Sequence, residues 1–273
     1  MTERNWDVDP SDPSYERRRT SFEQTADAYD RYRPAYPKVL FEALRTYADL
    51  APEDDRILEI GCGPGIATME LATWPNSVLA LEPAPAMAAT ARRKLAAHGN
   101  VEVLTTKFED WDLEPNTFGL VVCAQSFHWL DPRTRYARIA ETLYAHGTMA
   151  LISNTQINPP GYDFFHRVQD AYFEHAPQIA HKGDFRTDID ERWLDEIRST
   201  GLFEDVEARR FPWEWTLGRD DYIGKLGTHS NHAALPERQR AALSDGIAKL
   251  IDTDYDGVVT EHYVAEANLG RKR

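Results

Sequence analysis

Short apolar runs alternate with stretches of helical periodicity over the middle of the chain. The helical stretches carry apolar residues at every third or fourth position, as in the segment from about 132 to 146. Strands that are buried on both faces lose strict apolar–polar alternation, and the short runs lack it. The pattern therefore predicts a parallel sheet with helices on both faces. The runs are RILEI at 56–60, SVLALE at 77–82, VEVLTT at 101–106, FGLVVCAQ at 118–125 and GTMALISN at 147–154.

After residue 154 the regular alternation stops. Helices are predicted at 160–176, 190–200 and 236–251, and strand-like stretches at 206–217 and 258–269. The third of these helices is amphipathic, with its apolar residues on one face. The chain therefore continues past the regular sheet with helices and two further strands.

The same pattern indicates one domain behind a polar tail. Residues 1–20 show no periodicity, and the prolines of RYRPAYP interrupt the helical stretches that follow them. We predict a flexible tail at 1–20 and a single domain at 21–273. Its parts are an N-terminal helical lid at 21–50, a ligand-binding core at 51–154, cap helices and a sixth strand at 155–257, and a final strand at 258–273.

Composition narrows the function classes. The 273 residues include 31 Lys and Arg against 45 Asp and Glu, a net charge of −14, which opposes binding to nucleic acid or to an anionic membrane. No apolar run is long enough to span a membrane, and no signal peptide is recognisable. The two cysteines, Cys62 and Cys123, lack a second close ligand, so we expect reduced thiols, no metal site and a cytoplasmic location.

A glycine loop follows the first strand in LEIGCGPGIAT. Gly61, Gly63 and Gly65 stand between a strand and a helix, a spacing typical of nucleotide-type ligands. We expect Gly61 to permit the turn, Gly63 to let the backbone approach a ligand, and Gly65 to bring helix and strand together. A glycine turn without any ligand is the alternative.

Two acids favour a ligand. Glu82 ends the second strand, where a carboxylate accepts the hydroxyls of a ribose. Glu59 stands in a buried-looking strand, and burying it bare is costly, so it requires a cation or several donors. S-adenosylmethionine meets both needs, because it joins an ammonium, a carboxylate and a sulfonium to an adenosine. An NAD-type dehydrogenase would need its third glycine at Ile66 and would leave Glu59 unexplained.

These residues resemble a known family. LEIGCGPGIAT and LALEPAPAM are similar to the first two motifs of class I S-adenosylmethionine-dependent methyltransferases. KFEDWDL and FGLVVCAQSFHWLDP resemble the adenine-side loop and fourth strand of the small-molecule branch, in the style of trans-aconitate methyltransferase-like proteins. The resemblance implies a Rossmann-like α/β fold with inserted cap helices. Its seven-stranded, mostly parallel sheet has the order 3-2-1-4-5-7-6, and its last strand is antiparallel.

The resemblance also implies which residues contact the cofactor. Arg33 takes a position that pairs with the methionine carboxylate, and Lys107 stands where many members carry Asp. Ala124 and Gln125 lie beside the reactive methyl group. The full expected set is Tyr29, Arg33, Glu59, Gly61, Gly63, Gly65, Glu82, Pro83, Met87, Phe108, Glu109, Ala124 and Gln125.

The methyl acceptor is expected to be a small molecule that reacts through a hydroxyl or carboxylate oxygen. N- or C-methylation and non-catalytic cofactor binding remain alternatives. His128 is the candidate base for a hydroxyl, with a structural histidine as the alternative, and Tyr36, Trp129 and Trp213 are the candidate substrate contacts. We expect the polar stretch 228–232, THSNH, to be a solvated loop.

Overall fold

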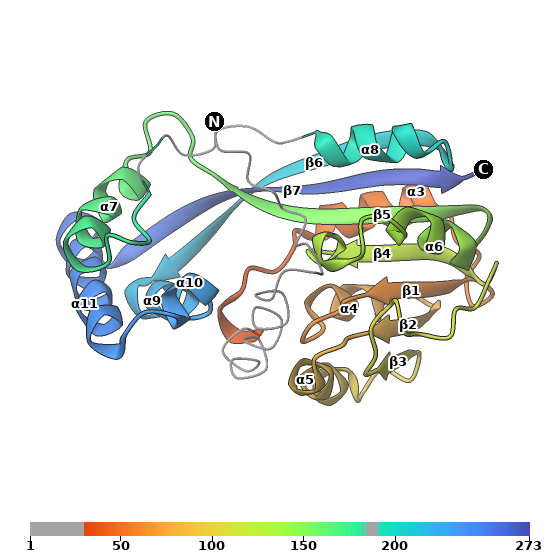
Figure 1. Cartoon of the computed structure of the whole chain (residues 1–273), viewed down its shortest axis with the longest axis horizontal. Coiled ribbons are helices and arrows are strands. Elements are labelled where there is room, and N and C mark those ends of the chain that lie inside the picture. Colours follow the sequence, from red (N-terminus) through yellow and green to blue (C-terminus); the bar gives the residue numbers. More distant parts are fainter. Residues whose placement is uncertain (1–29, 182, 184–190) are drawn as a thin grey trace.

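One seven-stranded sheet organises the molecule, in the order β3-β2-β1-β4-β5-β7-β6 (Figure 1). The structure is a computed structural model, and it describes residues 30–181, 183 and 191–273. Strands β1 to β5 pair in parallel, whereas β7 pairs antiparallel with both β5 and β6. The predicted order and the antiparallel last strand are confirmed. The strands are β1 Arg56–Ile60, β2 Ser77–Leu81, β3 Val101–Leu104, β4 Phe118–Ala124, β5 Leu143–Ile157, β6 Phe203–Gly218 and β7 Val258–Lys272.

Helices cover both faces of this sheet. Neighbouring residues of β1 belong to different cores: Ile57 to the cluster that holds Leu40 of α3, and Leu58 to the cluster that holds Ile139 of α6 and Ile197 of α8. Burial on both faces explains the lost alternation in the sequence. The helices are α3 Lys38–Ala48, α4 Ile66–Leu71, α5 Pro85–Leu95, α6 Arg135–Thr142, α7 Phe164–His175, α8 Arg192–Thr200, α9 Arg219–Gly227, α10 Ser230–Ala233 and α11 Glu237–Asp254, with a short 3₁₀ helix at Phe127–Trp129.

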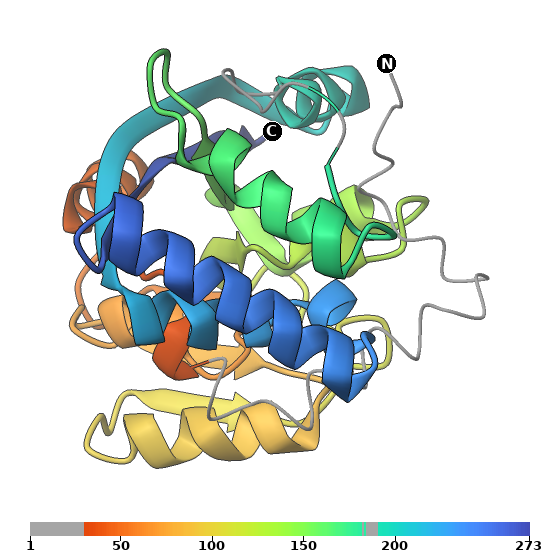
Figure 2. The same ribbon diagram turned by 90° about the vertical axis from the view of Figure 1, so that its left-hand side faces the viewer.

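The three strands β5, β7 and β6 run well beyond the parallel part of the sheet. Their extensions carry a third apolar cluster, built with residues of α7, α9 and α11. Figure 2 shows α7 and α11 lying side by side over this end of the molecule. We call the group α7, α9, α10 and α11 the cap.

The prediction of a helix from about 132 to 146 is wrong at its C-terminal end. The structure ends α6 at Thr142 and starts β5 at Leu143, which is fully buried and pairs with Phe118. The register then shifts before Leu120 pairs with Thr148. Tertiary pairing therefore overrides the helical period of this segment, an effect that local sequence patterns do not record.

None of the helices within the described ranges combines the length and the apolar character needed to cross a bilayer.

Candidate active site

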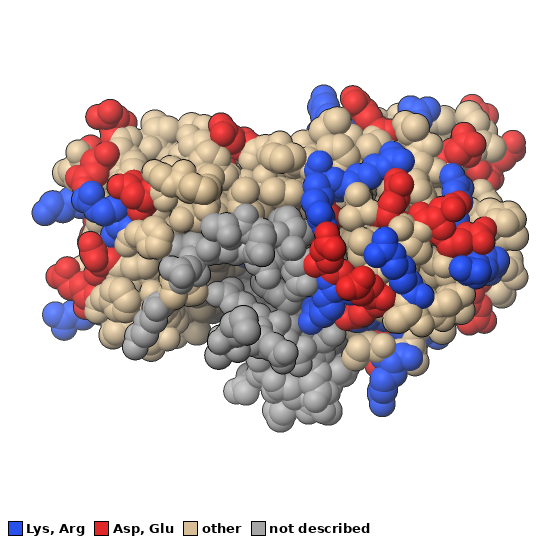
Figure 3. Space-filling model, turned by 90° about the horizontal axis from the view of Figure 1, so that it is seen from above, with Lys and Arg blue, Asp and Glu red and all other residues tan. Residues whose placement is uncertain are grey.

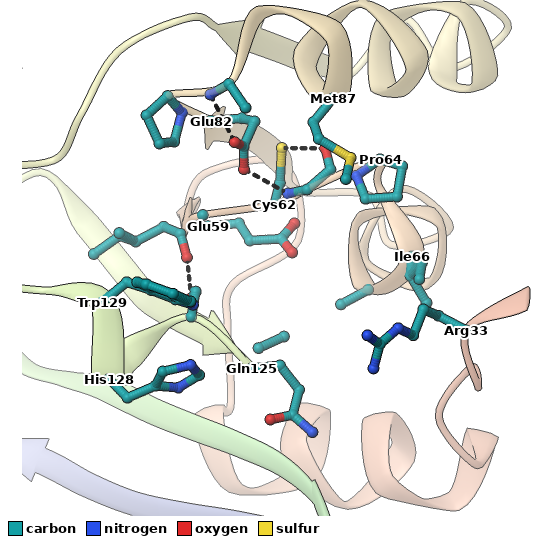
Figure 4. Close-up of a pocket in the computed structure, with 18 of the residues that line it drawn as sticks. Arg33, Glu59, Cys62, Pro64, Ile66, Glu82, Met87, Gln125, His128 and Trp129 are labelled. Atoms are coloured by element: carbon teal, nitrogen blue, oxygen red, sulfur yellow. Dashed lines mark hydrogen bonds between the residues drawn. The ribbon is translucent and has the colours of Figure 1, made fainter. Parts of the chain in front are cut away.

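A cavity of about 430 Å³ opens at the carboxyl ends of the parallel strands. Its lining comes from the loop after β1, the end of β2, segments 106–109 and 124–130, residues 33–36 ahead of α3, and the cap side of the sheet. Open α/β sheets place ligands at this edge, where the strand order reverses between β1 and β4. In Figure 4, Glu82 and Met87 lie at one end, His128 and Gln125 at the other, and Glu59 between them.

The three glycines of the loop serve different needs. All three have a positive φ, at +71° for Gly61, +57° for Gly63 and +88° for Gly65. A residue with a side chain would be strained in this region of backbone conformation. A Cβ on Gly61 would lie 2.6 Å from Cβ of Ser126, and one on Gly65 would lie 3.3 Å from Leu95. A Cβ on Gly63 would meet nothing within 4 Å. Gly61 and Gly65 therefore permit packing, whereas Gly63 leaves room on the cavity side.

Glu82 is fixed by the backbone around it. One carboxylate oxygen accepts the N–H of Gly63 at 2.8 Å, and the other accepts the N–H of Ala84 at 2.8 Å. An ionised carboxylate has about four acceptor sites, so these two bonds orient the group without exhausting it. The loop and the end of β2 are thereby locked into one rigid wall.

Glu59 is buried without a matching group. It is 1% exposed, and its Oε2 has no hydrogen-bond partner among the described residues. Burial raises its pKa to about 7; the Thr68 hydroxyl opposes this rise, and the Glu82 charge adds to it. A buried carboxylate oxygen that lines a cavity and lacks a donor fits a ligand bearing an ammonium group. This observation supports the expectation from the sequence that Glu59 faces a positively charged group of a ligand.

The end of β4 closes the opposite wall. Ser126 Oγ donates to the carbonyl of Ile60, which ties β4 to β1, and Gln125 Nε2 donates to the carbonyl of Asn154 at 3.0 Å. Phe127 is fully buried in the core, while His128 and Trp129 line the cavity with ring centroids 5.2 Å apart. The sequence FHW therefore supplies one core residue and two cavity residues.

Most of the expected site residues gather at this cavity. Gly65 packs behind the loop instead, and Tyr29 lies outside the described residues. Trp213 is absent from the lining; it stacks on Tyr263 and donates from Nε1 to Asn154 Oδ1 at 3.0 Å, one layer back. The residues that do line the cavity are Arg33, Tyr36, Glu59, Gly61, Gly63, Glu82, Pro83, Met87, Phe108, Glu109, Ala124, Gln125, His128 and Trp129.

The sequence missed the wall on the cap side. Gln156, Lys225, His229 and Tyr263 line the cavity there, from β5, α9, the turn after α9, and β7. Their sequence signal is weak: Gln156, Lys225 and Tyr263 each stand alone in an element that looks structural, and His229 belongs to the stretch expected to be a solvated loop. Only their proximity in the folded protein identifies them as candidate site residues.

The expectation of a solvated loop at 228–232 is wrong. Thr228 and His232 are each 4% exposed, and His232 Nε2 lies 2.9 Å from the hydroxyl of Tyr172. These two side chains are buried within the cap, whereas Asn231 in the same segment is exposed. Flanking apolar residues such as Leu226 and Leu235, both buried, were the available sequence signal.

Both cysteines are buried free thiols. Burial raises the pKa of Cys62, beside the glycine loop, and that of Cys123, within β4. Neither thiol is activated as a nucleophile.

Comparison with known proteins gives consistent matches. A family model described as "Methyltransferase domain" matches residues 57–147. An uncharacterized methyltransferase of Mycobacterium tuberculosis is 32% identical over 233 residues, which cover 85% of this chain and 86% of that protein. A malonyl-[acyl-carrier protein] O-methyltransferase of Legionella pneumophila is 28% identical over 171 residues, covering 60% of this chain and 57% of that protein.

Among solved structures, a putative type II methyltransferase from Anaeromyxobacter dehalogenans shares the fold. Its TM-score is 0.61 at 23% sequence identity, with 89% of this chain and 98% of that chain covered.

Proposed function

Because the chain belongs to the class I S-adenosylmethionine-dependent methyltransferases, we propose that it transfers the methyl group to an oxygen atom of a small-molecule acceptor. The observation that carries the proposal is the cavity itself. One end has a glycine loop and two buried acids, and the other end has aromatic and polar side chains beneath the cap. Its volume of about 430 Å³ is within the range of small-molecule sites.

The residues of the first end suit the parts of the cofactor. Glu82 would accept the ribose hydroxyls, Glu59 would face the amino group, and Arg33 would face the carboxylate. Gly63 gives the loop backbone room to pass the ligand. Pro83, Met87, Phe108 and Glu109 would surround the adenine, and Ala124 and Gln125 would lie beside the methyl group.

When bound, S-adenosylmethionine supplies a methyl group already activated by a sulfonium. The protein's own task is then to align the acceptor with the carbon–sulfur bond and to exclude water. Alignment supplies about 7–11 kcal/mol in well-oriented reactions. The rigid walls made by the Glu82 and Ser126 hydrogen bonds provide the fixed frame for that alignment.

Two further observations support a small oxygen acceptor. On the face in Figure 3, the described Lys and Arg lie interspersed with Asp and Glu, and the net charge is −14, which disfavours nucleic acid as the acceptor. The Legionella relative is named an O-methyltransferase. His128 would serve as the base if the acceptor is a hydroxyl, whereas a carboxylate needs none.

Calorimetry and a turnover assay test this function together. We expect S-adenosylhomocysteine to bind to the purified protein, and NAD and NADP not to bind. Incubation with S-adenosylmethionine and a panel of alcohols, phenols, carboxylates and amines should give methylated oxygen products by mass spectrometry. Binding without turnover on any acceptor would indicate a non-catalytic binder, and methylated nitrogen or carbon would contradict an oxygen acceptor.

A further inference from the structure

The segment 30–36, ahead of α3, lies between the cap and the parallel part of the sheet (Figure 1), and we call it the strap. At its start, the carboxylate of Asp30 accepts from Lys94 Nζ of α5. Near its end, the carbonyl of Ala35 accepts from Asn154 Nδ2 of β5 at 3.2 Å. The strap is therefore attached at both ends to elements of the sheet and its helices.

Between these two attachments, the strap rests on a glycine of α9. A Cβ on Gly224 would lie 2.5 Å from Cζ and 2.6 Å from Cε1 of Tyr32, whereas Cβ atoms in proteins essentially never come within 3.0 Å of such neighbours. A Cβ on Gly227, in the same helix, would meet nothing within 4 Å. Glycine inside a helix is less favourable than alanine, and the close approach of the Tyr32 ring is the physical reason for it at position 224.

Arg33 directly follows Tyr32 in the strap. Its Nη2 donates to the carbonyl of Thr228, just after α9, at 3.1 Å. Its side chain lines the cavity, and Figure 4 shows the guanidinium directed inward. The helix below it is a fixed support, because Lys225 Nζ of α9 donates to Glu261 Oε1 of β7 at 2.6 Å. Two adjacent contacts with this support restrict the conformations open to a long, flexible side chain.

From this geometry we propose that Tyr32 and Gly224 are positioning residues for the cofactor. The Tyr32 ring, seated on Gly224, holds Arg33 where the carboxylate of S-adenosylmethionine binds. The inference rests on the proposed function, in which Arg33 faces that carboxylate. Neither Tyr32 nor Gly224 lines the cavity, so both act through Arg33. The cap thereby contributes to cofactor binding, although the glycine loop and the two acids belong to the parallel part of the sheet.

Calorimetry with S-adenosylhomocysteine tests the seat on α9. Gly224→Ala displaces the Tyr32 ring and should raise the Kd about 10-fold, as when a hydrogen bond to a charged group is weakened. Gly227→Ala is the matched control, because it makes the same change in the same helix without a clash, and its Kd should equal that of the wild type. Thermal melting of the ligand-free proteins separates binding from folding. An unchanged Kd in Gly224→Ala, or an equal rise in Gly227→Ala, overturns the inference.

Variants of Tyr32 probe the same contact from the strap. Tyr32→Ala removes the ring and should raise the Kd about as much as Gly224→Ala does. Tyr32→Phe keeps the ring carbons that meet Gly224 and should bind like the wild type. Neither variant alters α9, so this pair decides the question even where Gly224→Ala fails to fold. Tyr32→Ala binding as tightly as Tyr32→Phe contradicts the inference.

The double variant Tyr32→Ala/Arg33→Met shows whether the effect passes through Arg33. Its Kd should equal that of Arg33→Met alone, because residues that act through one contact are not additive. Methylthioadenosine has the adenosine of the cofactor but no carboxylate, so Tyr32→Ala should leave its affinity unchanged. Additive losses, or an equal loss of methylthioadenosine affinity, overturn the inference. A wild-type protein that binds no S-adenosylhomocysteine would instead refute the proposed function.

Discussion

Glu59 and Glu261 are equally buried, each 1% exposed, yet their surroundings differ completely. Glu261 accepts from Lys225, Gln156 and Tyr263, so its charge is matched within the protein. Glu59 has an oxygen without a partner in the described chain, and burial raises its pKa to about 7. A matched buried acid leaves no uncompensated charge in the protein, whereas an unmatched one carries a desolvation cost that a bound cation can remove.

Removing the cation that pairs with Glu261, the matched acid, should have the largest effect on stability. Lys225→Met leaves Glu261 buried without its cation, and loss of one partner from a buried pair costs about 3–5 kcal/mol. We expect urea denaturation to show a loss of this size in the free energy of unfolding. The double variant Lys225→Met/Glu261→Gln should recover most of it, because no uncompensated charge remains. A single variant as stable as the wild type would mean that Glu261 is not held by Lys225.

Neutralising Glu59, the unmatched acid, should have the opposite effect and raise the free energy of unfolding at neutral to alkaline pH. The pKa of Glu59 is raised from an ordinary 4.5 to about 7, so the folded protein binds its proton more tightly than the unfolded chain. The wild type should therefore lose stability as pH rises from about 4.5 to above 7, by up to about 3 kcal/mol. Glu59→Gln should remove this loss and be the more stable protein at pH 8.

The same Glu59→Gln variant should bind S-adenosylhomocysteine more weakly, because the ammonium loses its counter-charge. Denaturation at pH 5 and pH 8 and calorimetry at pH 8 measure the two effects on one sample. A variant that is less stable than the wild type at pH 8 would show that Glu59 is already satisfied in the ligand-free protein.

A smaller effect is expected where the acid is already held by the backbone. Glu82→Ala removes the proposed ribose contact and should weaken S-adenosylhomocysteine binding by about 1.5–3 kcal/mol. Glu82→Gln keeps one oxygen acceptor and should lose less. Because Glu82 also accepts the Gly63 N–H, circular dichroism and thermal melting must show that the fold survives. Equal affinity in all three proteins would separate Glu82 from the cofactor.

The smallest effect is expected at His128. If the acceptor is a carboxylate, no base is needed, and His128→Ala should change kcat only through packing, by less than about tenfold, with no loss of a pH-dependent limb. A hydroxyl acceptor would instead require the base, whose removal typically costs 10²–10⁴-fold in rate. The pH–rate profiles of the wild type and of His128→Ala distinguish these two acceptor classes.

Much of the fold was readable because the information is local. Each of the five short apolar runs became a strand, and the glycine loop followed the first of them as expected. The end of α6 was not readable, because Leu143 is drawn into the sheet by its pairing with Phe118. The full lengths of β5, β6 and β7 could not be predicted either, because they depend on the cap that packs on these strands.

The sequence by itself determined the strand ends that carry Glu59 and Glu82, because a few consecutive residues specify strand, turn and helix. Only the tertiary structure decided the cap-side wall. Gln156, Lys225, His229 and Tyr263 are far apart in the chain and meet only when β5, β7 and α9 fold together. Burial places Thr228 and His232 of the THSNH segment in the interior and leaves one acid matched and the other open. Burial is a property of the whole fold rather than of any short stretch.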